Sequence, residues 1–289
     1  MNPETAKRLC ALNNAFYRDN SGSFSETRQS PWPGWTRCLE VLRAQGGLPD
    51  DRRAGGRRAG GRQSLSILDL ACGNLRFERF LASALPDAAL AFHAVDNCDS
   101  LASPMPGAKN RRLDWSTDRR LTYQSLDILD TLHSGLCLND RLAAPLCDLA
   151  VSFGFLHHVP LREYREKVLA SLVRQTRPGG FVIVSLWQFL NDEALAQRAQ
   201  ATREHALQEL GLPALDDNDC LLGWKNLPGT YRYCHHFSEL EIDRLVESIA
   251  PVATARTTSA PSASLLARFT SDGRTGDLNT YLVMRVSCP

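Results

Sequence analysis

The stretch from Ser66 to Phe77, S-I-L-D-L-A-C-G-N-L-R-F, sets an apolar run directly before a sharp turn and a helix. The run from Leu65 to Leu70 predicts a buried parallel strand, and Leu75 to Leu85 predicts the helix that follows it. In an open α/β sheet, a turn at the carboxyl end of the first strand is where an adenosine-type cofactor sits. Gly73 suits this turn because a Cβ there would block the approach of a ligand to the backbone. A dinucleotide-binding turn has three glycines, so we do not expect a pyrophosphate ligand.

The composition is typical of a soluble globular protein. With 289 residues, 43% hydrophobic and 22% charged, the chain can bury a large core as one domain or as one domain with an insertion. No apolar stretch approaches the ~20 residues that span a bilayer, and the N-terminal residues lack an apolar signal core. The nine cysteines form no C-x-x-C pair, so we expect reduced thiols in a cytoplasmic protein rather than disulfides or structural zinc. The net charge of +1 gives no overall electrostatic case for nucleic acid.

Four more apolar runs predict strands that alternate with helices. These runs are residues 89–95, 119–126, 146–153 and 181–187. A helix is expected over 161–177, where proline and glycines follow as a stop signal. With two closing strands at 252–258 and 280–287, the last of them antiparallel at the sheet edge, the pattern predicts an α/β fold. We expect a doubly wound, Rossmann-like sheet of seven strands.

The N-terminal residues 1–45 predict two helices, over 4–18 and 35–42, that flank an irregular Ser- and Pro-rich stretch over 21–33. Two prolines fix the backbone around Trp32. The indole is either a packing anchor or part of a lid across the carboxyl end of the first strand. In the second case Phe24, Arg28 and Trp32 are its contacts.

Residues 46–63 repeat R-R-A-G-G without apolar periodicity, which predicts a flexible loop. It is either a solvated insertion or a phosphate-contacting arm. The domain proper is then 64–289, and residues 188–237 interrupt its alternation as a substrate-side insertion that contains an irregular acidic stretch around 216–219. The spacing of those acids lacks the EF-hand pattern, so we expect no metal. Ser238 predicts an N-cap with Glu241 at capping-box spacing.

In this order, the features resemble class I S-adenosylmethionine (SAM) methyltransferases. Asp69 to Asn74 is similar to the first motif of that class, D-x-G-C-G-x-G, although Ala71 and Leu75 occupy glycine positions. Asp96, Asp127, the segment F-G-F-L-H-H-V and the R-P-G-G before the fifth strand follow in the same sequence. The resemblance covers about residues 65–289 and implies SAM as the cofactor.

The position of Asp96 after the second strand suits hydrogen bonds with ribose hydroxyls. The resemblance further implies that Asp127 accepts from the adenine amine while Ile128 lies against the ring. The implied cofactor-binding residues are Arg28, Trp32, Asp69, Ala71, Cys72, Gly73, Asn74, Asp96, Asn97, Asp127, Ile128, Ser152, Phe153 and Gly154. The catalytic candidates are His157 and Arg232.

Two stretches resemble a narrower group, the tRNA methyltransferases that esterify a carboxymethyl group on wobble uridine. Phe24 to Pro33 is similar to that group's F-x-x-T-R-x-x-P-W-P, and Tyr231 to Phe237 is similar to its R-Y-Y-H-x-Y/F segment. The resemblance implies tRNA as a partner and extends to a small activating subunit. Arg232 suits a carboxylate or phosphate of the substrate, and His235 and His236 are further candidates for substrate binding.

Three functions remain open from the sequence. The first is a tRNA carboxyl methyltransferase, which the two narrower motifs favour. The second is a small-molecule O- or N-methyltransferase, which the near-neutral charge favours. The third is a catalytically silent SAM-binding scaffold, suggested by Ala71 and Leu75 in place of glycine.

Overall fold

The computed structural model describes residues 1–48, 64–102, 119–225, 227–251 and 261–287. Its centre is a seven-stranded sheet in the order β3-β2-β1-β4-β5-β9-β8. Strands β1 to β5 pair in parallel, and β9 runs antiparallel to both of its neighbours. The strands are β1 (Ser64–Leu70), β2 (Ala89–Asp96), β3 (Arg119–Ser125), β4 (Cys147–Ser152), β5 (Thr176–Trp187), β8 (Ala263–Ser271) and β9 (Asn279–Val286). The predicted doubly wound, Rossmann-like sheet is confirmed.

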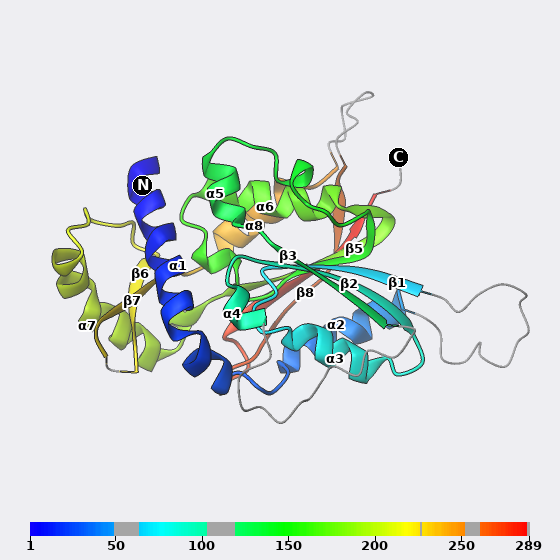
Figure 1. Ribbon diagram of the computed structural model, residues 1–289, viewed down its shortest axis with the longest axis horizontal. Helices are drawn as coiled ribbons and strands as arrows, with labels where there is room; N and C mark the ends of the chain where they lie inside the picture. Colours follow the sequence, from blue (N-terminus) through cyan, green and yellow to red (C-terminus); the bar gives the residue numbers. More distant parts are fainter. Residues whose placement is uncertain (49–63, 103–118, 226, 252–260, 288–289) are drawn as a thin grey trace, which may run out of the picture.

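Helices cover both faces of this sheet (Figure 1). The reason is the alternation of apolar side chains along each strand, since Ile67 packs into one core cluster and its neighbour Leu68 into the other. One cluster lies under α5 (Ile128–His133), α6 (Arg162–Arg174) and α8 (Glu239–Glu247). The other lies under α2 (Pro33–Ala44) and α3 (Arg76–Ala84). The short helix α4 (Asp99–Ala102) follows β2.

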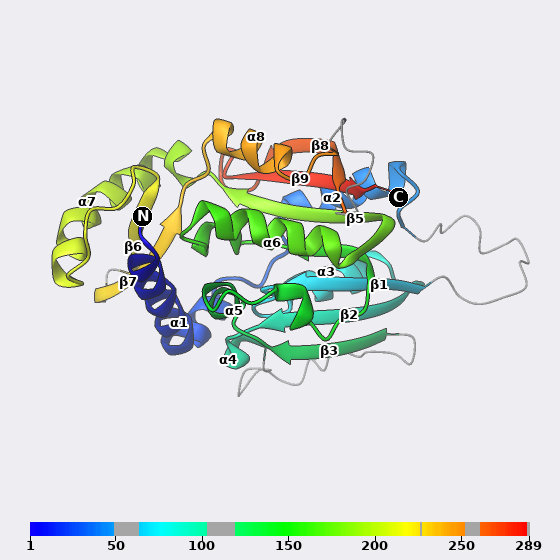
Figure 2. The ribbon, with the colours of Figure 1, turned by 90° about the horizontal axis from the view of Figure 1, so that it is seen from above.

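A third group of elements lies at the carboxyl ends of the strands (Figure 2). It consists of α1 (Pro3–Glu26), α7 (Glu193–Glu209) and an antiparallel pair, β6 (Asp219–Trp224) and β7 (Leu227–His235). A buried cluster that includes Leu9, Ala206, Leu221 and Tyr233 holds them together. The 3-10 helices are η2 (Leu138–Asp140), η3 (Leu156–His158) and η4 (Phe189–Asn191). Residues 188–237 therefore pack with the N-terminal helix above the edge of the sheet where a cofactor is expected.

Two expectations about elements are wrong, and one is only partly right. The helix α1 continues through 21–26, where we expected an irregular stretch, because Phe24 packs edge-on against Tyr17 at 5.0 Å between ring centroids. The acidic stretch is irregular over 216–218 as expected, but its last residue, Asp219, is the first residue of strand β6 and pairs with β7. Strand β9 lies between β5 and β8 rather than at the edge.

Two further expectations concern segments that lie wholly or mostly outside the described residues. These are the strand expected over 252–258 and most of the loop expected over 46–63. Ser238 is confirmed as the N-cap of α8, where its side chain accepts from the amide of Glu241 at 3.3 Å. Among the helices that the structure describes, none is long and apolar enough to cross a membrane.

Candidate functional site

A cavity of about 780 Å³ lies at the carboxyl ends of β1, β2 and β4, beneath α1 and the segment that leads into α2. Its wall contains every expected cofactor-binding residue except Ser152, and it contains both catalytic candidates, His157 and Arg232. Ser152 is fully buried, and its hydroxyl donates to the carbonyl of Leu70 at 2.8 Å, so it joins β4 to β1 instead of reaching the cavity.

The turn after β1 has the backbone of a glycine-rich turn although two of its residues are not glycine. Ala71, Gly73 and Leu75 have φ angles of 66°, 56° and 57°. A Cβ on Gly73 would meet no atom within 4 Å, so the open side of the turn faces free space. The amide of Gly73 donates to Asp96 Oδ2 at 2.8 Å, which joins the turn to the end of β2. Ala71 and Leu75 therefore adopt the left-handed backbone conformation that glycine adopts more easily, at the steric cost that this region has for a residue with a Cβ.

Buried carboxyl groups gather behind this turn. Asp69 is 3% exposed and Glu78, on α3, is fully buried. Oδ1 of Asp69 and both side-chain oxygens of Glu78 accept no hydrogen bond from any described group. Burial, and then the neighbouring Glu78 and Asp96, raise the pKa of Asp69 well above its usual value. Burial likewise raises the pKa of Glu78 to about 7.

Asp127 caps α5 and is tied to the N-terminal helix. Its Oδ1 accepts from the amides of Leu129 and Asp130 at 3.0 and 2.9 Å. Its Oδ2 accepts from Asn14 at 2.7 Å and from Asn97 at 3.0 Å. Both carboxylate oxygens of Asp127 therefore accept hydrogen bonds from within the chain.

The segment between α1 and α2 accepts hydrogen bonds from the turn and from the start of α3. Asn74 Nδ2 donates to the carbonyl of Arg28 at 3.1 Å, and Arg76 Nη1 donates to the carbonyl of Ser30 at 3.1 Å. The ring of Trp32 lies against Gly154, where a Cβ would approach the indole to 3.0 Å. Trp32 also packs on Trp35 with 5.3 Å between ring centroids. It is thus both a packing anchor and part of the cavity wall.

The opposite end of the cavity is cationic and aromatic. The guanidinium of Arg28 lies 3.8 Å from the ring centroid of Phe24. Arg232 lies 5.6 Å from the ring centroids of Trp187 and Trp224. Within the described parts of the chain, neither arginine forms an ion pair, and Arg232 Nε has no partner. Burial and then Arg232 lower the pKa of Arg28 to about 10, so both remain charged at neutral pH.

Both His157 and His158 line the cavity, but their nitrogens differ. His158 Nδ1 lies 2.8 Å from the carbonyl of Tyr233, which only accepts, so Nδ1 carries the proton. Nε2 then accepts from the hydroxyl of Tyr17 at 2.7 Å. His157 Nδ1 has no partner among the described groups. Burial lowers the pKa of both histidines, that of His158 to about 3, so both are neutral at pH 7.

The candidate substrate residues on β7 point to opposite sides of the strand, because successive side chains alternate. Arg232 points into the cavity, whereas Tyr231 and Tyr233 pack into the cluster below α1 and α7. His235 and His236 do not line the cavity. His236 Nδ1 accepts from the amide of Leu190 at 3.1 Å, so it serves the loop before α7.

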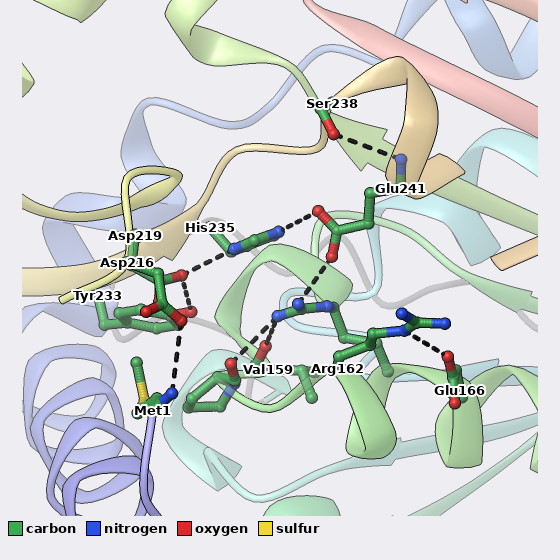
Figure 3. Close-up of polar contacts among 12 residues, drawn as sticks. Met1, Val159, Arg162, Glu166, Asp216, Asp219, Tyr233, His235, Ser238 and Glu241 are labelled. Carbon is green, nitrogen blue, oxygen red and sulfur yellow. Dashed lines mark hydrogen bonds and ion pairs between the residues drawn. The ribbon is translucent and has the colours of Figure 1, made fainter. Parts of the chain in front are cut away.

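His235 belongs to a buried polar network behind the cavity (Figure 3). Its Nδ1 lies 2.7 Å from Asp219 Oδ1, and its Nε2 lies 2.7 Å from Glu241 Oε2. The Tyr233 hydroxyl donates to the same Asp219 oxygen at 2.6 Å, and Arg165 donates to Glu241 at 2.7 Å. The network ties β6 and β7 to α6 and α8.

Several wall residues were not expected from the sequence. Asn13, Asn14 and Tyr17 come from α1, and Trp187 comes from the end of β5. Asn13 holds β7 in place, because its Oδ1 accepts from the amide of Tyr233 at 2.8 Å and its Nδ2 donates to the carbonyl of Tyr233 at 3.1 Å. The sequence feature that could have indicated this role is the pair of adjacent asparagines, Asn13 and Asn14, in an otherwise amphipathic helix.

Three metal-ligand side chains, His157, His158 and Cys234, place one ligand atom each within 4.8 Å of one another. Both nitrogens of His158 are already hydrogen-bonded, and the cation of Arg232 lies beside the group. The cluster is therefore arranged for hydrogen bonding, and we assign no metal to it.

Comparisons with known proteins were made for the chain and for its fold. No protein-family model matches the chain. The tRNA (carboxymethyluridine(34)-5-O)-methyltransferase ALKBH8 of Mus musculus is 25% identical over 175 residues, which are 59% of this chain and 19% of that protein. A tRNA (carboxymethyluridine(34)-5-O)-methyltransferase of Arabidopsis thaliana is 42% identical over 40 residues, which are 14% of this chain and 10% of that protein. The chain thus spans about a fifth or less of the curated relatives that it matches.

Among solved structures, an S-adenosylmethionine-dependent methyltransferase from Clostridium acetobutylicum superposes with a TM-score of 0.51 at 11% identity. The match covers 91% of this chain and 94% of that one. The chain therefore has the fold of SAM-dependent methyltransferases. The resemblance drawn from its motifs, to this class and to tRNA methyltransferases, is confirmed.

Proposed function

We propose that this chain is a SAM-dependent methyltransferase that esterifies the carboxylate of a carboxymethyl-type modified uridine in tRNA. The observation that carries the acceptor is the pair Arg28 and Arg232, two unpaired cations within the described residues, in the cavity that also holds the turn after β1. The charge of Arg232 contributes to the lowered pKa of Arg28, so the two like charges repel, and an anion beside them would relieve that repulsion.

The wall residues fit SAM at the other end of the cavity. Gly73 leaves the turn open, and Oδ1 of Asp69 accepts no hydrogen bond from any described group. Asp96 would hold the ribose hydroxyls, and Asp127 with Ile128 would hold the adenine. SAM, when bound, supplies a methyl group on a sulfonium and leaves as S-adenosylhomocysteine.

Methyl transfer to a carboxylate asks the protein for alignment rather than for a base. A carboxylate is ionised at neutral pH because its pKa is ~4. In the proposed reaction one carboxylate oxygen forms a bond to the methyl carbon, the carbon–sulfur bond breaks, and no proton moves. Arg28 and Arg232 orient the acceptor, while the indole rings of Trp187 and Trp224 pack against Arg232.

A second acceptor class, a phenol or amine of a small molecule, is favoured by one observation. His157 is neutral and its Nδ1 has no partner within the described structure, so it is placed to take a proton from such an acceptor. The two classes differ in which side chain matters more, Arg232 for a carboxylate and His157 for a protonated nucleophile.

For tRNA, the proposal adds phosphate contacts that make binding depend on salt. The proposal assigns these contacts to the arginines in 52–62 and to Arg111, Arg112, Arg119 and Arg120, and all of them except the last two lie outside the described residues. Arg119 instead donates to the carbonyls of Leu85 and Pro86, so Arg120 is the exposed cation of that pair. A small activating subunit remains part of the proposal.

The test uses labelled SAM and bulk tRNA treated with alkali to remove existing esters, with and without cell extract to supply a partner subunit. Alkali-labile label on a modified uridine is expected, with turnover reduced about a hundredfold in Arg232→Gln. The exposed Arg244→Gln on α8 is the control for loss of one positive charge. Label that resists alkali, or that enters small molecules alone, refutes the tRNA ester and supports the second acceptor class.

A further inference from the structure

The start of α2 is held by a residue from the far end of the chain. Trp32 is the N-cap of this helix, but its side chain caps no backbone amide. Pro33 has no N–H group, and the amide of Trp35 donates to the carbonyl of Trp32 at 3.1 Å. The amide of Gly34 requires an acceptor from elsewhere, and it donates to Oδ1 of Asp272 at 3.0 Å. Asp272, in the loop between β8 and β9, therefore supplies the cap that α2 lacks.

The position of Asp272 is itself fixed by two donors from β9. Its Oδ2 accepts from Asn279 Nδ2 at 2.9 Å and from the Tyr281 hydroxyl at 2.5 Å. Asp272 is 5% exposed, and both of its side-chain oxygens accept from within the chain. The ring of Tyr281 also lies against Gly34, where a Cβ would come within 2.2 Å of a ring carbon. The loop therefore presents this carboxylate to the start of α2 in one orientation.

The contact between Asp272 and α2 lies at one end of a segment that forms part of the cavity wall. Every residue from 27 to 33 lines the cavity. Toward α1, two carbonyls of this segment accept from side chains of the turn after β1 and of α3. Between those bonds and the start of α2, the Trp32 indole lies against Gly154. The wall segment is thus anchored to the cofactor turn at one end and to the loop between β8 and β9 at the other.

We propose that Asp272 is a positioning residue for the cofactor, which acts through this wall segment and not by contact with the methyl donor. The inference rests on the proposed binding of SAM in the cavity. Without Asp272, the Gly34 amide has no acceptor, so the start of α2 and the Trp32 indole can leave the aligned position. Loss of a side-chain cap shifts the equilibrium of a helix end by about tenfold. The apparent affinity for SAM falls with the fraction of aligned molecules.

The experiment compares Asp272→Ala with Arg37→Met in the full chain. Arg37 makes a different contact between α2 and β8, because its Nη1 donates to the carbonyl of Thr270 at 2.6 Å and its guanidinium lies 4.2 Å from the ring centroid of Phe269. It does not line the cavity, so Arg37→Met is the matched control for a weakened contact between helix and hairpin. Titration calorimetry with SAM and with S-adenosylhomocysteine gives the dissociation constant and the number of sites per chain.

We expect Asp272→Ala to weaken both nucleosides about tenfold and Arg37→Met to weaken them less than about twofold. A purely structural loss would lower the number of sites per chain and leave the dissociation constant unchanged. A direct contact with the sulfonium would weaken SAM more than S-adenosylhomocysteine, because only SAM carries that charge. Either of these results overturns the positioning role.

A double-mutant cycle with Trp32→Phe tests the route of the effect. If Asp272 acts through the wall segment, the losses of the two variants are less than additive when combined, and fully additive losses overturn the inference. If Asp272→Ala does not fold, Asp272→Asn takes its place, because it keeps one oxygen for the three donors, and a loss of at least about threefold is expected. Unchanged affinity in a folded Asp272 variant, or an equal loss in Arg37→Met, refutes this inference alone. If SAM does not bind to the unmodified chain, the proposed cofactor site is wrong and the inference falls with it.

Discussion

Replacing His235 by phenylalanine should destabilise the chain by about 3 kcal/mol, although this residue does not reach the cavity. The imidazole lies 2.7 Å from both Asp219 and Glu241 (Figure 3), and the Asp219 side chain is 3% exposed. Loss of one partner from a buried ion pair costs about 3 to 5 kcal/mol. We expect the lower value because Tyr233 still donates to Asp219 and Arg165 still donates to Glu241. For 289 residues the melting temperature should fall by about 5 °C.

The pKa of His235 determines whether the loss of stability is larger at low or at high pH. Burial alone would lower the pKa of His235, but its hydrogen bonds to Asp219 and Glu241 raise it above the usual value. The stabilisation is therefore complete below the unfolded pKa of about 6.5 and is lost as pH rises through the folded value. The loss caused by His235→Phe should be larger at pH 6 than at pH 9.

Urea unfolding of both proteins at these pH values measures the difference. Arg268→Met is the matched control, since Arg268 pairs with Glu239 and Asp243, whose side chains are 69% and 57% exposed. That exposed network should contribute less than about 1 kcal/mol. Equal losses in the two variants, or a His235→Phe loss that grows with pH, would refute the role of the buried network.

Three further predictions concern the cavity. Asp96→Ala should weaken binding of SAM by about 1 to 3 kcal/mol through lost hydrogen bonds, and unchanged affinity in calorimetry would show that the ribose site is misplaced. Arg28→Ala should reduce turnover with little change in melting temperature, since the guanidinium forms no ion pair with any described carboxylate; a large thermal loss with full activity contradicts this. Ala71→Gly should stabilise the chain by about 0.5 to 1 kcal/mol in urea unfolding, because φ is 66° there, and a destabilised variant would mean that the strain is not relieved.

Local patterns in the sequence were sufficient for the sheet and for the position of the cofactor turn. The apolar run before Gly73 and the acids Asp96 and Asp127 follow successive strands, and parallel strands bring such positions to one edge. Ala71 and Leu75, which stand where the motif has glycine, both adopt positive φ angles in this turn.

Patterns were weaker where long-range pairing decides the direction of a side chain. Ser152 follows the same strand logic as Phe153, yet it points to the backbone of β1 because successive residues alternate across the sheet. On β7 the same alternation sends Arg232 into the cavity and leaves His235 behind it, and the register with β6 sets which residues those are.

The sequence by itself therefore determined the Rossmann-like fold and the acidic end of the cavity, because both follow from residues close together along the chain. Only the tertiary structure decided the rest. Tyr17 reaches the wall because α1 packs on β7, and Asn14 of the same helix donates to Asp127 at the start of α5. Those contacts join segments that are far apart in the sequence. The local pattern of one segment does not predict its contact with the other, so these polar groups meet only in the folded chain.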